Sequence, residues 1–231
     1  MMGKVMVFAP HMDDEVIGCG GSLVKHSERG DLIKVFYFTK GTGFLTDEIR
    51  GDMNAEVRDN EALEVIKMLG ATCYMAGIRE RELRYNVEVL KKVIREIQDY
   101  QPDIIYLPHE DETDYEHRLV NQIVTEAIFL AYSTYDCEHS EKINRARIIL
   151  EYEVWSPIKD VDFVNDIKMQ VAKKAELIKK YNSQTEIIKY HEGAVSLNHY
   201  RGIMKAHKDS FAEAFKIKCL SREIVENIVY Y

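Results

Sequence analysis

The stretch VMVFAPHMDDE, residues 5–15, decides the fold of this chain and carries its chemistry. Its first four residues form a short apolar run that ends close to a proline, which is typical of a buried strand. The residues from Val16 onward have the pattern of a helix. One histidine and three consecutive acids therefore lie in a strand-to-helix turn, and such turns form the ligand sites of open α/β sheets.

This acidic turn has two interpretations of similar weight when it is considered alone. In the first, His11 and Asp14 bind a divalent metal ion and Asp13 remains available as a base, because buried acids beside a core strand need a cation or a proton. In the second, the acids only favour the positive N-terminal end of the helix dipole. The remainder of the chain distinguishes between them.

Beyond the turn, apolar β-branched runs alternate with amphipathic helical patterns. This alternation predicts an α/β fold, a Rossmann-like three-layer sandwich with a mostly parallel sheet, right-handed crossovers and helices on both faces. No linker or shift in composition marks a boundary, so we expect a single domain over residues 1–231. The predicted strands are Val5–Phe8, Leu32–Thr39, Thr72–Ala76, Asp103–Leu107, Arg147–Val154 and Phe215–Cys219. The predicted helices are Val16–Arg29, Asn54–Leu69, Val87–Ile97, Leu119–Ile128, Ile167–Tyr181 and Gly193–His207.

Composition narrows the class of protein. With 46% hydrophobic and 30% charged residues, the chain has the composition of a soluble globular protein. A net charge of −8 argues against a non-specific nucleic-acid binder, and the apolar run at the N-terminus is too short for a signal peptide or a membrane span. The four cysteines are scattered without a CxxC pair, which fits a reducing compartment. We therefore expect a cytoplasmic protein with no nucleic-acid partner and no membrane span.

A second turn rich in histidine and acids, HEDETDYEHR at residues 109–118, follows the fourth predicted strand. The carboxyl ends of parallel strands share one edge of the sheet, so both turns can converge on one site. A catalytic zinc typically has three His or carboxylate ligands and an open position for water, and His11, Asp14 and His117 supply that set. Zinc lowers the pKa of its water to about 7, and Asp13 is a carboxylate that can exchange a proton with it. The chemistry so specified is metal-assisted hydrolysis, most naturally of an amide.

Plainer interpretations stand beside this hypothesis. From spacing alone, His117 is more simply an exposed residue in the first turn of a helix. Asp114 fits a structural role as well, because residues 113–116 match a capping box and Asp114 could itself be the N-cap. Glu15 fits a helix N-terminus without any further task.

These residues resemble the PIG-L (LmbE-like) family of zinc-dependent N-deacetylases. The family's first motif reads Ala-His-Pro-Asp-Asp-Glu before a glycine-rich stretch, and this chain has PHMDDE at 10–15 and GCGG at 18–21, with Met12 in place of the proline. The resemblance continues in the right order along nearly the whole chain, at residues 58–62, 69–70, 108–118, 173–184, 201–202 and 212–215.

The resemblance implies roles for individual residues. His11, Asp14 and His117 look like zinc ligands, Asp13 like the general base, and Arg58 like an arginine that holds the substrate. The family releases acetate from N-acyl amino sugars and their conjugates, and many members form homo-oligomers. The resemblance thus implies a zinc-dependent N-deacetylase acting on a small N-acylated sugar or conjugate, although Fe²⁺ or another divalent metal can use the same ligand set.

One departure from the family concerns Asp114, which we count with Asp13 among the candidate catalytic residues. The second motif usually reads His-x-Asp-His, and its first histidine helps to stabilise the charged tetrahedral intermediate; here that place is taken by Asp114. A like charge about 4 Å away at an effective dielectric of about 20 would oppose an oxyanion by roughly 4 kcal/mol. That penalty is comparable to the loss of an oxyanion donor, about 2.7–4 kcal/mol.

Three outcomes are open for Asp114. In the first outcome, Asp114 is turned away as a helix cap. In the second, it is protonated, or it orients another donor such as His109 or His191. In the third, the activity is weak or directed at another bond. We favour the first two. Glu116 in place of the usual Asp is a milder change, because a carboxylate there can still orient a ligand histidine.

Two rivals to the deacetylase remain. One is a hydrolase of a different amide or an ester bond, and the other is a catalytically weakened member of the same fold that only binds a metal or a sugar. The retained Asp13 argues against the second, because binding alone needs no free base. A dinucleotide-binding site is disfavoured, since residues 18–21 do not give GxGxxG.

Overall fold

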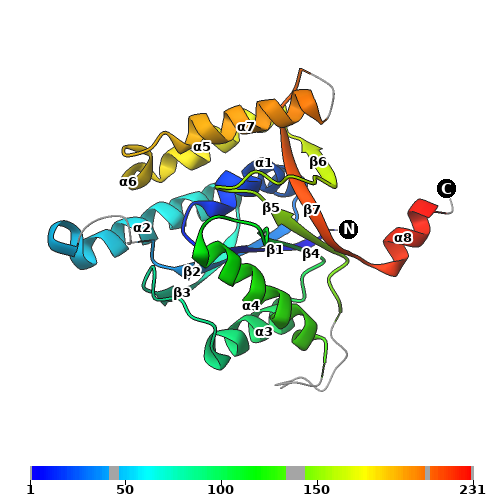
Figure 1. Ribbon diagram of the computed structural model, residues 1–231, viewed down its shortest axis with the longest axis horizontal. Helices are drawn as coiled ribbons and strands as arrows, with labels where there is room; N and C mark the ends of the chain where they lie inside the picture. The colour runs from blue at the N-terminus through cyan, green and yellow to red at the C-terminus, as the bar shows by residue number, and fades with distance from the viewer. Residues whose placement is uncertain (1, 42–46, 134–143, 206–208, 230–231) are drawn as a thin grey trace.

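The computed structural model describes residues 2–41, 47–133, 144–205 and 209–229. Within these ranges, seven strands form one sheet in the order β3-β2-β1-β4-β5-β7-β6, with helices above and below it (Figure 1). The strands are β1 Lys4–Ala9, β2 Leu32–Thr39, β3 Thr72–Ile78, β4 Ile104–Pro108, β5 Ile148–Tyr152, β6 Phe163–Asp166 and β7 Ala212–Leu220. The helices are α1 Asp14–Glu28, α2 Asp47–Leu69, α3 Val87–Tyr100, α4 Tyr115–Ala131, α5 Val171–Lys180, α6 Asn182–Thr185, α7 Tyr190–Met204 and α8 Arg222–Val229.

The topology places β1 and β4 side by side at the centre of the sheet. Strands β1 to β5 are parallel, and β7 runs antiparallel to both β5 and β6. From β1 the chain proceeds outward through β2 to β3, then returns to the other side of β1 as β4 and proceeds to β5. The gap between the turns that follow β1 and β4 is therefore the switch point of the sheet, where open α/β folds bind their ligands.

Alternation along β1 explains the three layers. Val5 and Val7 point into a core shared with α1, α2 and α5, whereas Met6 and Phe8 point into a second core shared with α3 and α4. All four side chains are fully buried. Both faces of the strand are thus covered, as expected for a parallel sheet, and the predicted α/β sandwich with helices on both faces is confirmed.

Helix α1 is kinked where it passes over the sheet. Cys19 has non-helical dihedral angles, φ −133° and ψ 21°. The amides of Gly21 and Ser22 donate instead to the two carboxylate oxygens of Glu213, at 2.7 and 2.8 Å, and the Lys174 ammonium donates to the same carboxylate at 2.8 Å. A side chain at Gly18 could not be accommodated, because its Cβ would lie 2.2 Å from the Tyr152 ring.

Replacing Glu213 with alanine is expected to lower the free energy of unfolding by about 3–5 kcal/mol, because a fully buried Lys174 loses its partner. Urea unfolding measures the change. The control is Glu176→Ala, which removes the exposed ion pair with Lys173 and is expected to cost under about 1 kcal/mol. Equal effects of the two variants would contradict a structural role for the buried pair.

Element boundaries differ from the sequence prediction at several places. Helix α1 begins at Asp14, two residues early, because the carbonyl of Asp13 already accepts the amides of Val16 and Ile17. Helix α2 begins at Asp47 instead of Asn54. Helix α5 begins after Ile167, whose amide donates to the carbonyl oxygen of Phe211, the residue before β7. Helix α7 ends at Met204, and the predicted end at His207 lies outside the described residues. Strand β6 and helices α6 and α8 were not predicted.

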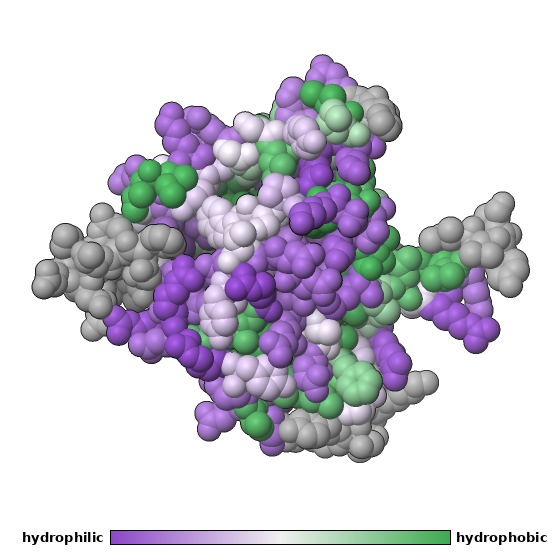
Figure 2. Space-filling view, in the orientation of Figure 1, coloured by the Kyte–Doolittle hydropathy of each residue, from purple (hydrophilic) through white to green (hydrophobic). Residues whose placement is uncertain are grey.

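The C-terminal segment leaves the body of the molecule. Helix α8 extends away from the sheet at the end of β7, and hydrophobic side chains gather where β7 leads into it (Figures 1 and 2). Cys19, Cys73 and Cys219 carry free thiols, whereas Cys137 lies outside the described residues. Among the helices of the described ranges, none is both long enough and apolar enough to cross a lipid bilayer.

Candidate active site

The two turns rich in histidine and acids meet at the switch point of the sheet. His11 lies in the turn between β1 and α1, and His117 lies in the first turn of α4, directly after the β4–α4 turn. The ring centroids of the two histidines are 5.2 Å apart. His117 is completely buried, so the interpretation of it as an exposed first-turn residue is wrong.

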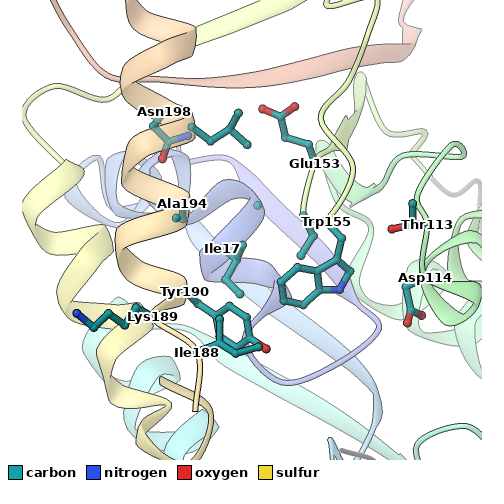
Figure 3. A pocket seen from close by; sticks show the side chains of 14 residues that line it. Ile17, Thr113, Asp114, Glu153, Trp155, Ile188, Lys189, Tyr190, Ala194 and Asn198 are labelled. Atoms are coloured by element: carbon teal, nitrogen blue, oxygen red, sulfur yellow. The ribbon is translucent and has the colours of Figure 1, made fainter. Parts of the chain in front are cut away.

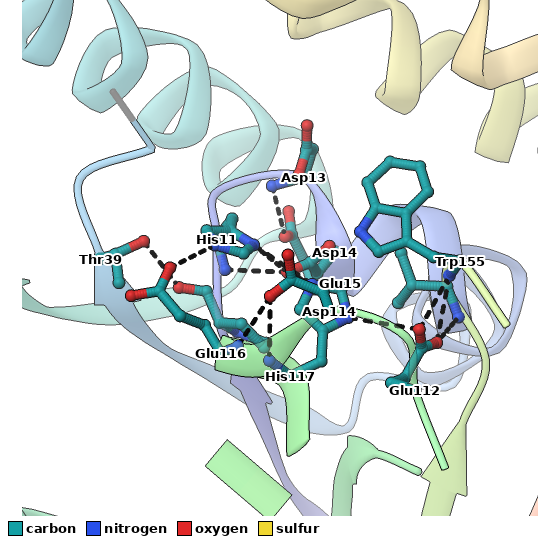
Figure 4. A network of polar contacts seen from close by, with 12 residues as sticks. His11, Asp13, Asp14, Glu15, Thr39, Glu112, Asp114, Glu116, His117 and Trp155 are labelled. Carbon is teal, nitrogen blue, oxygen red and sulfur yellow. Dashed lines mark hydrogen bonds and ion pairs between the residues drawn. The ribbon is translucent and has the colours of Figure 1, made fainter. Parts of the chain in front are cut away.

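Three side-chain atoms form a nearly equilateral triangle at this point (Figure 4). His11 Nδ1 lies 3.2 Å from Asp14 Oδ2 and 3.2 Å from His117 Nε2, and Asp14 Oδ2 lies 3.2 Å from His117 Nε2. Ligand atoms bound tetrahedrally at about 2.0–2.2 Å from a zinc ion are roughly 3.3 Å apart. The triangle therefore has the dimensions of one face of a zinc site.

The surroundings of His11 favour a positive charge at this point. Its Nε2 lies 2.9 Å from a carboxylate oxygen of Glu116 and donates to it. In a neutral imidazole, which carries one N–H, Nδ1 would then present a lone pair to Asp14 Oδ2 and His117 Nε2, a contact that needs a cation or a proton between the atoms. Burial lowers the pKa of His11, but the carboxylates of Asp14 and Glu116 raise it well above its usual value, so a proton occupies this place when no metal ion is bound. The other oxygen of Asp14 is buried without a hydrogen-bond partner in the described part of the chain, which also fits a metal ligand.

Two other groupings of potential ligands surround His11. Asp114 offers an oxygen within 4.8 Å of both histidines, and Glu80 and Glu116 lie near His11 Nε2. Both oxygens of Asp114 are engaged, however, one by helix amides and one by Arg81. We therefore assign Asp14, which contacts both histidine nitrogens, as the third member of the candidate ligand set.

Outer carboxylates lie beside both histidines, but only His11 is hydrogen-bonded to one, since His117 Nδ1 has no hydrogen-bond partner in the described part of the chain. Glu116 accepts from His11, and its other oxygen accepts the amide of Arg81 at 2.9 Å. Glu112 lies 3.8 Å from His117 Nδ1 and accepts the amides of residues 154–156, at 2.7 to 3.1 Å for the shortest contact of each. Such carboxylates fix the ring orientation of ligand histidines. The expectation that Glu116 orients a ligand histidine agrees with its contact to His11.

Asp13 has a strained backbone and a buried side chain. Its φ of 135° and ψ of −23° lie in a region that non-glycine residues rarely adopt, at a cost of about 1–3 kcal/mol. Its amide donates to Glu15, whose other oxygen accepts from the Tyr181 hydroxyl at 2.6 Å. Burial raises the pKa of Asp13 to about 8, against the opposing effect of the Arg58 guanidinium. A divalent cation beside it would lower that pKa, so the carboxylate is suited to exchange a proton near neutral pH.

Arg58 reaches this carboxylate from α2. Its Nη2 lies 3.4 Å from Asp13 Oδ2 and donates to the carbonyl oxygen of Met12, and its guanidinium lies over the Tyr181 ring. The side chain is almost completely buried. Arg58 and Asp13 line a small cavity of about 40 Å³ together with His11, Tyr190 and other side chains. Arg58 is thus placed both to hold Asp13 and to border any bound substrate.

The structure distinguishes the outcomes that were open for Asp114. Asp114 is the N-cap of α4, and its Oδ1 accepts the amides of Glu116 at 2.7 Å and His117 at 3.4 Å, so the prediction of a helix cap is confirmed. The prediction that it is turned away from the site is wrong, because Asp114 borders the small cavity together with His11 and Asp13. Its Oδ2 accepts from Arg81 Nη1 at 2.7 Å. Burial would raise the pKa of Asp114, but the Arg81 hydrogen bond and the neighbouring histidines outweigh it and lower the pKa. The ion pair with Arg81 and the lowered pKa favour the ionised form of Asp114 over the protonated alternative.

The donor that Asp114 orients is also different from the ones we considered. His109 pairs with the carbonyl oxygen of Ser156 at 2.7 Å, and His191 lies beside Glu192. Asp114 instead holds Arg81, which borders the same small cavity.

The family described as PIG-L, GlcNAc-PI de-N-acetylase, matches residues 6–128, which include both turns of the site. The chain belongs to the PIG-L family. The resemblance found in the sequence is confirmed, and it covers β1 through most of α4.

Individual relatives agree with this membership. The PIG-L chain is 31% identical over 121 residues to a diacetylchitobiose deacetylase of Thermococcus kodakarensis, a match that covers 49% of this chain and 45% of that protein. The aligned part thus spans less than half the length of that relative. The structure superimposes on an N,N'-diacetylchitobiose deacetylase from Pyrococcus horikoshii with a TM-score of 0.81 at 24% identity, covering 93% of this chain and 83% of that one.

The same fold also serves another reaction. The 4-carboxy-2-hydroxymuconate hydratase GalB of Pseudomonas putida KT2440 superimposes with a TM-score of 0.80 at 21% identity, covering 95% of this chain and 98% of that one. Likeness at these identities establishes the PIG-L fold, and the reaction has to be argued from the site.

Sequence reasoning missed several residues of this PIG-L site. Glu80 and Arg81 follow β3, Glu112 lies in the β4–α4 turn, and Trp155 follows β5. Each comes after the carboxyl end of a parallel strand, so the rule that located His11 would have located them too. What the sequence does not give is which of the many acids in these segments turns inward.

Proposed function

We propose that this chain is a metal-dependent N-deacetylase, which cleaves the amide of an N-acetylated amino sugar or one of its conjugates and releases acetate. The observation that carries the proposal is the 3.2 Å triangle of His11, Asp14 and His117 beside a buried Asp13, the N-cap residue of α1, whose carboxylate makes no capping hydrogen bond. Membership of the PIG-L family and the deacetylase relatives support the choice of an N-acetyl sugar.

The candidate ligands would bind the metal through His11 Nδ1, Asp14 Oδ2 and His117 Nε2, and we propose Zn²⁺. When bound, the ion polarises the amide carbonyl and lowers the pKa of water to about 7. Asp13 takes the proton from the attacking water and returns it to the nitrogen of the leaving amine. Arg58 keeps the Asp13 carboxylate in position and contacts the substrate.

Asp114 and Arg81 act together in this proposal. The Arg81 guanidinium offsets the negative charge of Asp114, so the oxyanion does not face an uncompensated carboxylate. Asp114 is a positioning residue, since it caps the helix that carries His117 and directs Arg81 to the cavity.

A double-mutant cycle tests this pairing. Asp114→Asn and Arg81→Met are each expected to lower kcat/KM, and the double variant is expected to lose about as much as either single variant. Because an asparagine also caps helices, Asp114→Asn should retain the stability of α4, whereas Asp114→Ala should lose about 1 kcal/mol. Additive losses in kcat/KM would contradict the pairing.

The function is tested by measuring metal content together with product formation. The purified chain is incubated with N-acetylglucosamine and N,N'-diacetylchitobiose, and acetate and free amine are quantified. Simple acetate esters test for ester hydrolysis, and an unsaturated dicarboxylic acid tests for water addition, because a hydratase shares the fold. We expect acetate and amine in equal amounts from the sugars. Turnover of only the ester or the unsaturated acid would overturn the proposal.

A further inference from the structure

A second, much larger cavity adjoins the candidate active site. Its volume is about 550 Å³, and it lies between the start of α1, the segment that follows β5, and α7 (Figure 3). Asp114, Trp155 and Tyr190 line both this cavity and the small one beside His11 and Asp13. The two spaces are therefore neighbours that share these three side chains.

One face of α7 forms a wall of the large cavity. Tyr190, Gly193, Ala194 and Leu197 line it, at the spacing of one helical face. The residues that α7 buries in the fold are Asn198, which also lines the cavity, and Arg201 and Gly202 beyond it. A Cβ added at Gly193 would meet no heavy atom within 4 Å, so the space beside this position is open.

The opposite wall combines apolar and polar groups. Ile17 of α1 and the Trp155 indole face α7 across the cavity, with Glu153, Thr113 and Asp114 on the same side (Figure 3), and Val154 also lines it. The Trp155 ring lies 5.1 Å from the Tyr190 ring and stacks on His117 at 6.3 Å between centroids. Trp155 therefore connects the wall of the cavity directly to a candidate metal ligand.

The negative charge of Glu153 on the wall of the cavity is compensated by its neighbours. The Glu153 carboxylate that lines the cavity accepts from Arg201 at 2.6 Å and from the amide of Ile158 at 2.8 Å. A bound apolar group would not leave that carboxylate unpaired, so the cavity is suited to a hydrocarbon group.

We propose that this cavity binds an apolar group of the substrate, either an acyl chain longer than acetyl on the amide or an alkyl or aryl group on the sugar. The proposal rests on the proposed function, since the small cavity would hold the amide. The volume is within the range of about 300–1,000 Å³ typical of small-molecule sites. A methylene takes up about as much room as a water molecule, roughly 30 Å³, so an eight-carbon chain fits with space to spare.

Binding can be measured without catalysis, because Trp155 is the only tryptophan of the chain and lines the cavity. The zinc-loaded full-length protein is titrated with N-octanoylglucosamine and with octyl N-acetylglucosaminide, each against its short counterpart, N-acetylglucosamine and methyl N-acetylglucosaminide. Tryptophan emission is recorded in the first seconds after mixing. We expect a shift in emission and a roughly two- to fourfold gain in affinity for each added methylene, in the acyl arm or in the glycoside arm.

Gly193→Leu tests the location, because Gly193 lines the cavity at an exposed position with room for a side chain, and leucine is a better helix former than glycine. We expect at least a tenfold loss of affinity for the octyl compound and under a twofold change for its short counterpart. The affinity of Gly193→Ala for the octyl compound should lie between those of the wild type and Gly193→Leu. The matched control is Ser196→Leu, which adds the same side chain at an exposed position of α7 outside the lining.

The outcomes separate this proposal from the proposed function. Chain-length dependence that Gly193→Leu abolishes and Ser196→Leu preserves would support the cavity, even if no acetate or octanoate were released. Equal affinity for short and octyl compounds in both arms, or an unchanged preference in Gly193→Leu, would overturn it, even if deacetylation were observed.

Discussion

Replacing Asp13 with asparagine is expected to lower kcat by about 10²–10⁴-fold while the metal content of the protein stays unchanged. The asparagine amide cannot take a proton from water at neutral pH. It nearly matches the carboxylate in shape, and asparagine tolerates the positive φ of this position better than most residues. Because Asp13 is not a member of the 3.2 Å triangle, metal analysis of the variant should give the wild-type ratio.

The control for this variant is Asp111→Asn, which changes an exposed acid of the β4–α4 turn by the same substitution. It should retain wild-type kcat. A loss of kcat in Asp13→Asn but not in Asp111→Asn would exclude a general effect of removing one negative charge near the site. An Asp13→Asn enzyme with kcat within a fewfold of wild type would remove Asp13 from the role of base, and a variant without metal would indicate that Asp13 contributes to binding the ion.

The sequence was sufficient for the central part of the fold because there the local pattern and the tertiary environment agree. Strand β2 was predicted with its observed bounds, since Leu32–Thr39 is a continuous β-branched and aromatic run. The convergence of His11 and His117 followed from a topological rule about the edges of parallel sheets. That rule needs only the order of strands and helices, which the hydrophobic periodicity supplied.

The missed elements lack such a signal. Strand β6 is four residues long and lies at the edge of the sheet, where it pairs only with β7 among the described strands. Helix α6 is also four residues long, which is too short for a helical period. Helix α5 was predicted to begin at Ile167, but the amide of this residue donates to the carbonyl oxygen of Phe211, just before β7, a long-range contact that periodicity cannot reveal.

Asp114 shows the limit of reading a site from its motif. The sequence showed an acid where the family has a histidine, and it supported the helix cap through the N-cap pattern. The partner that makes the acid tolerable, Arg81, comes from a different turn 33 residues earlier in the chain. Its φ of 68° and the contact of its amide with Glu116 fix the backbone there. Pairing between turns depends on backbone geometry that local sequence does not encode.

Removing one of the proposed metal ligands is expected to have the second large effect. His117→Ala should lose stoichiometric metal and lower kcat/KM by more than about 100-fold, because even loss of an outer partner of a metal ligand costs about 10–100-fold. Glu116→Gln, which only weakens the contact to His11 Nε2, should fall within that smaller range. His26→Gln is the control, since His26 is also buried but pairs with Asp31 and Tyr106 away from the site.

The same variants can be compared by thermal unfolding, which reports metal binding without any substrate. A ligand at 100 times its Kd stabilises the native state by about 2.7 kcal/mol, which for a chain of this size raises Tm by roughly 5–10 °C. We expect Zn²⁺ to produce this shift in the metal-stripped wild type and in His26→Gln, and not in His117→Ala. The reason is geometric: His11 Nδ1, Asp14 Oδ2 and His117 Nε2 converge at 3.2 Å from one another, and His117→Ala removes one of these three proposed ligand atoms. A full zinc-dependent shift in His117→Ala would exclude His117 from the ligand set and would favour the grouping of His11 with Glu80 and Glu116.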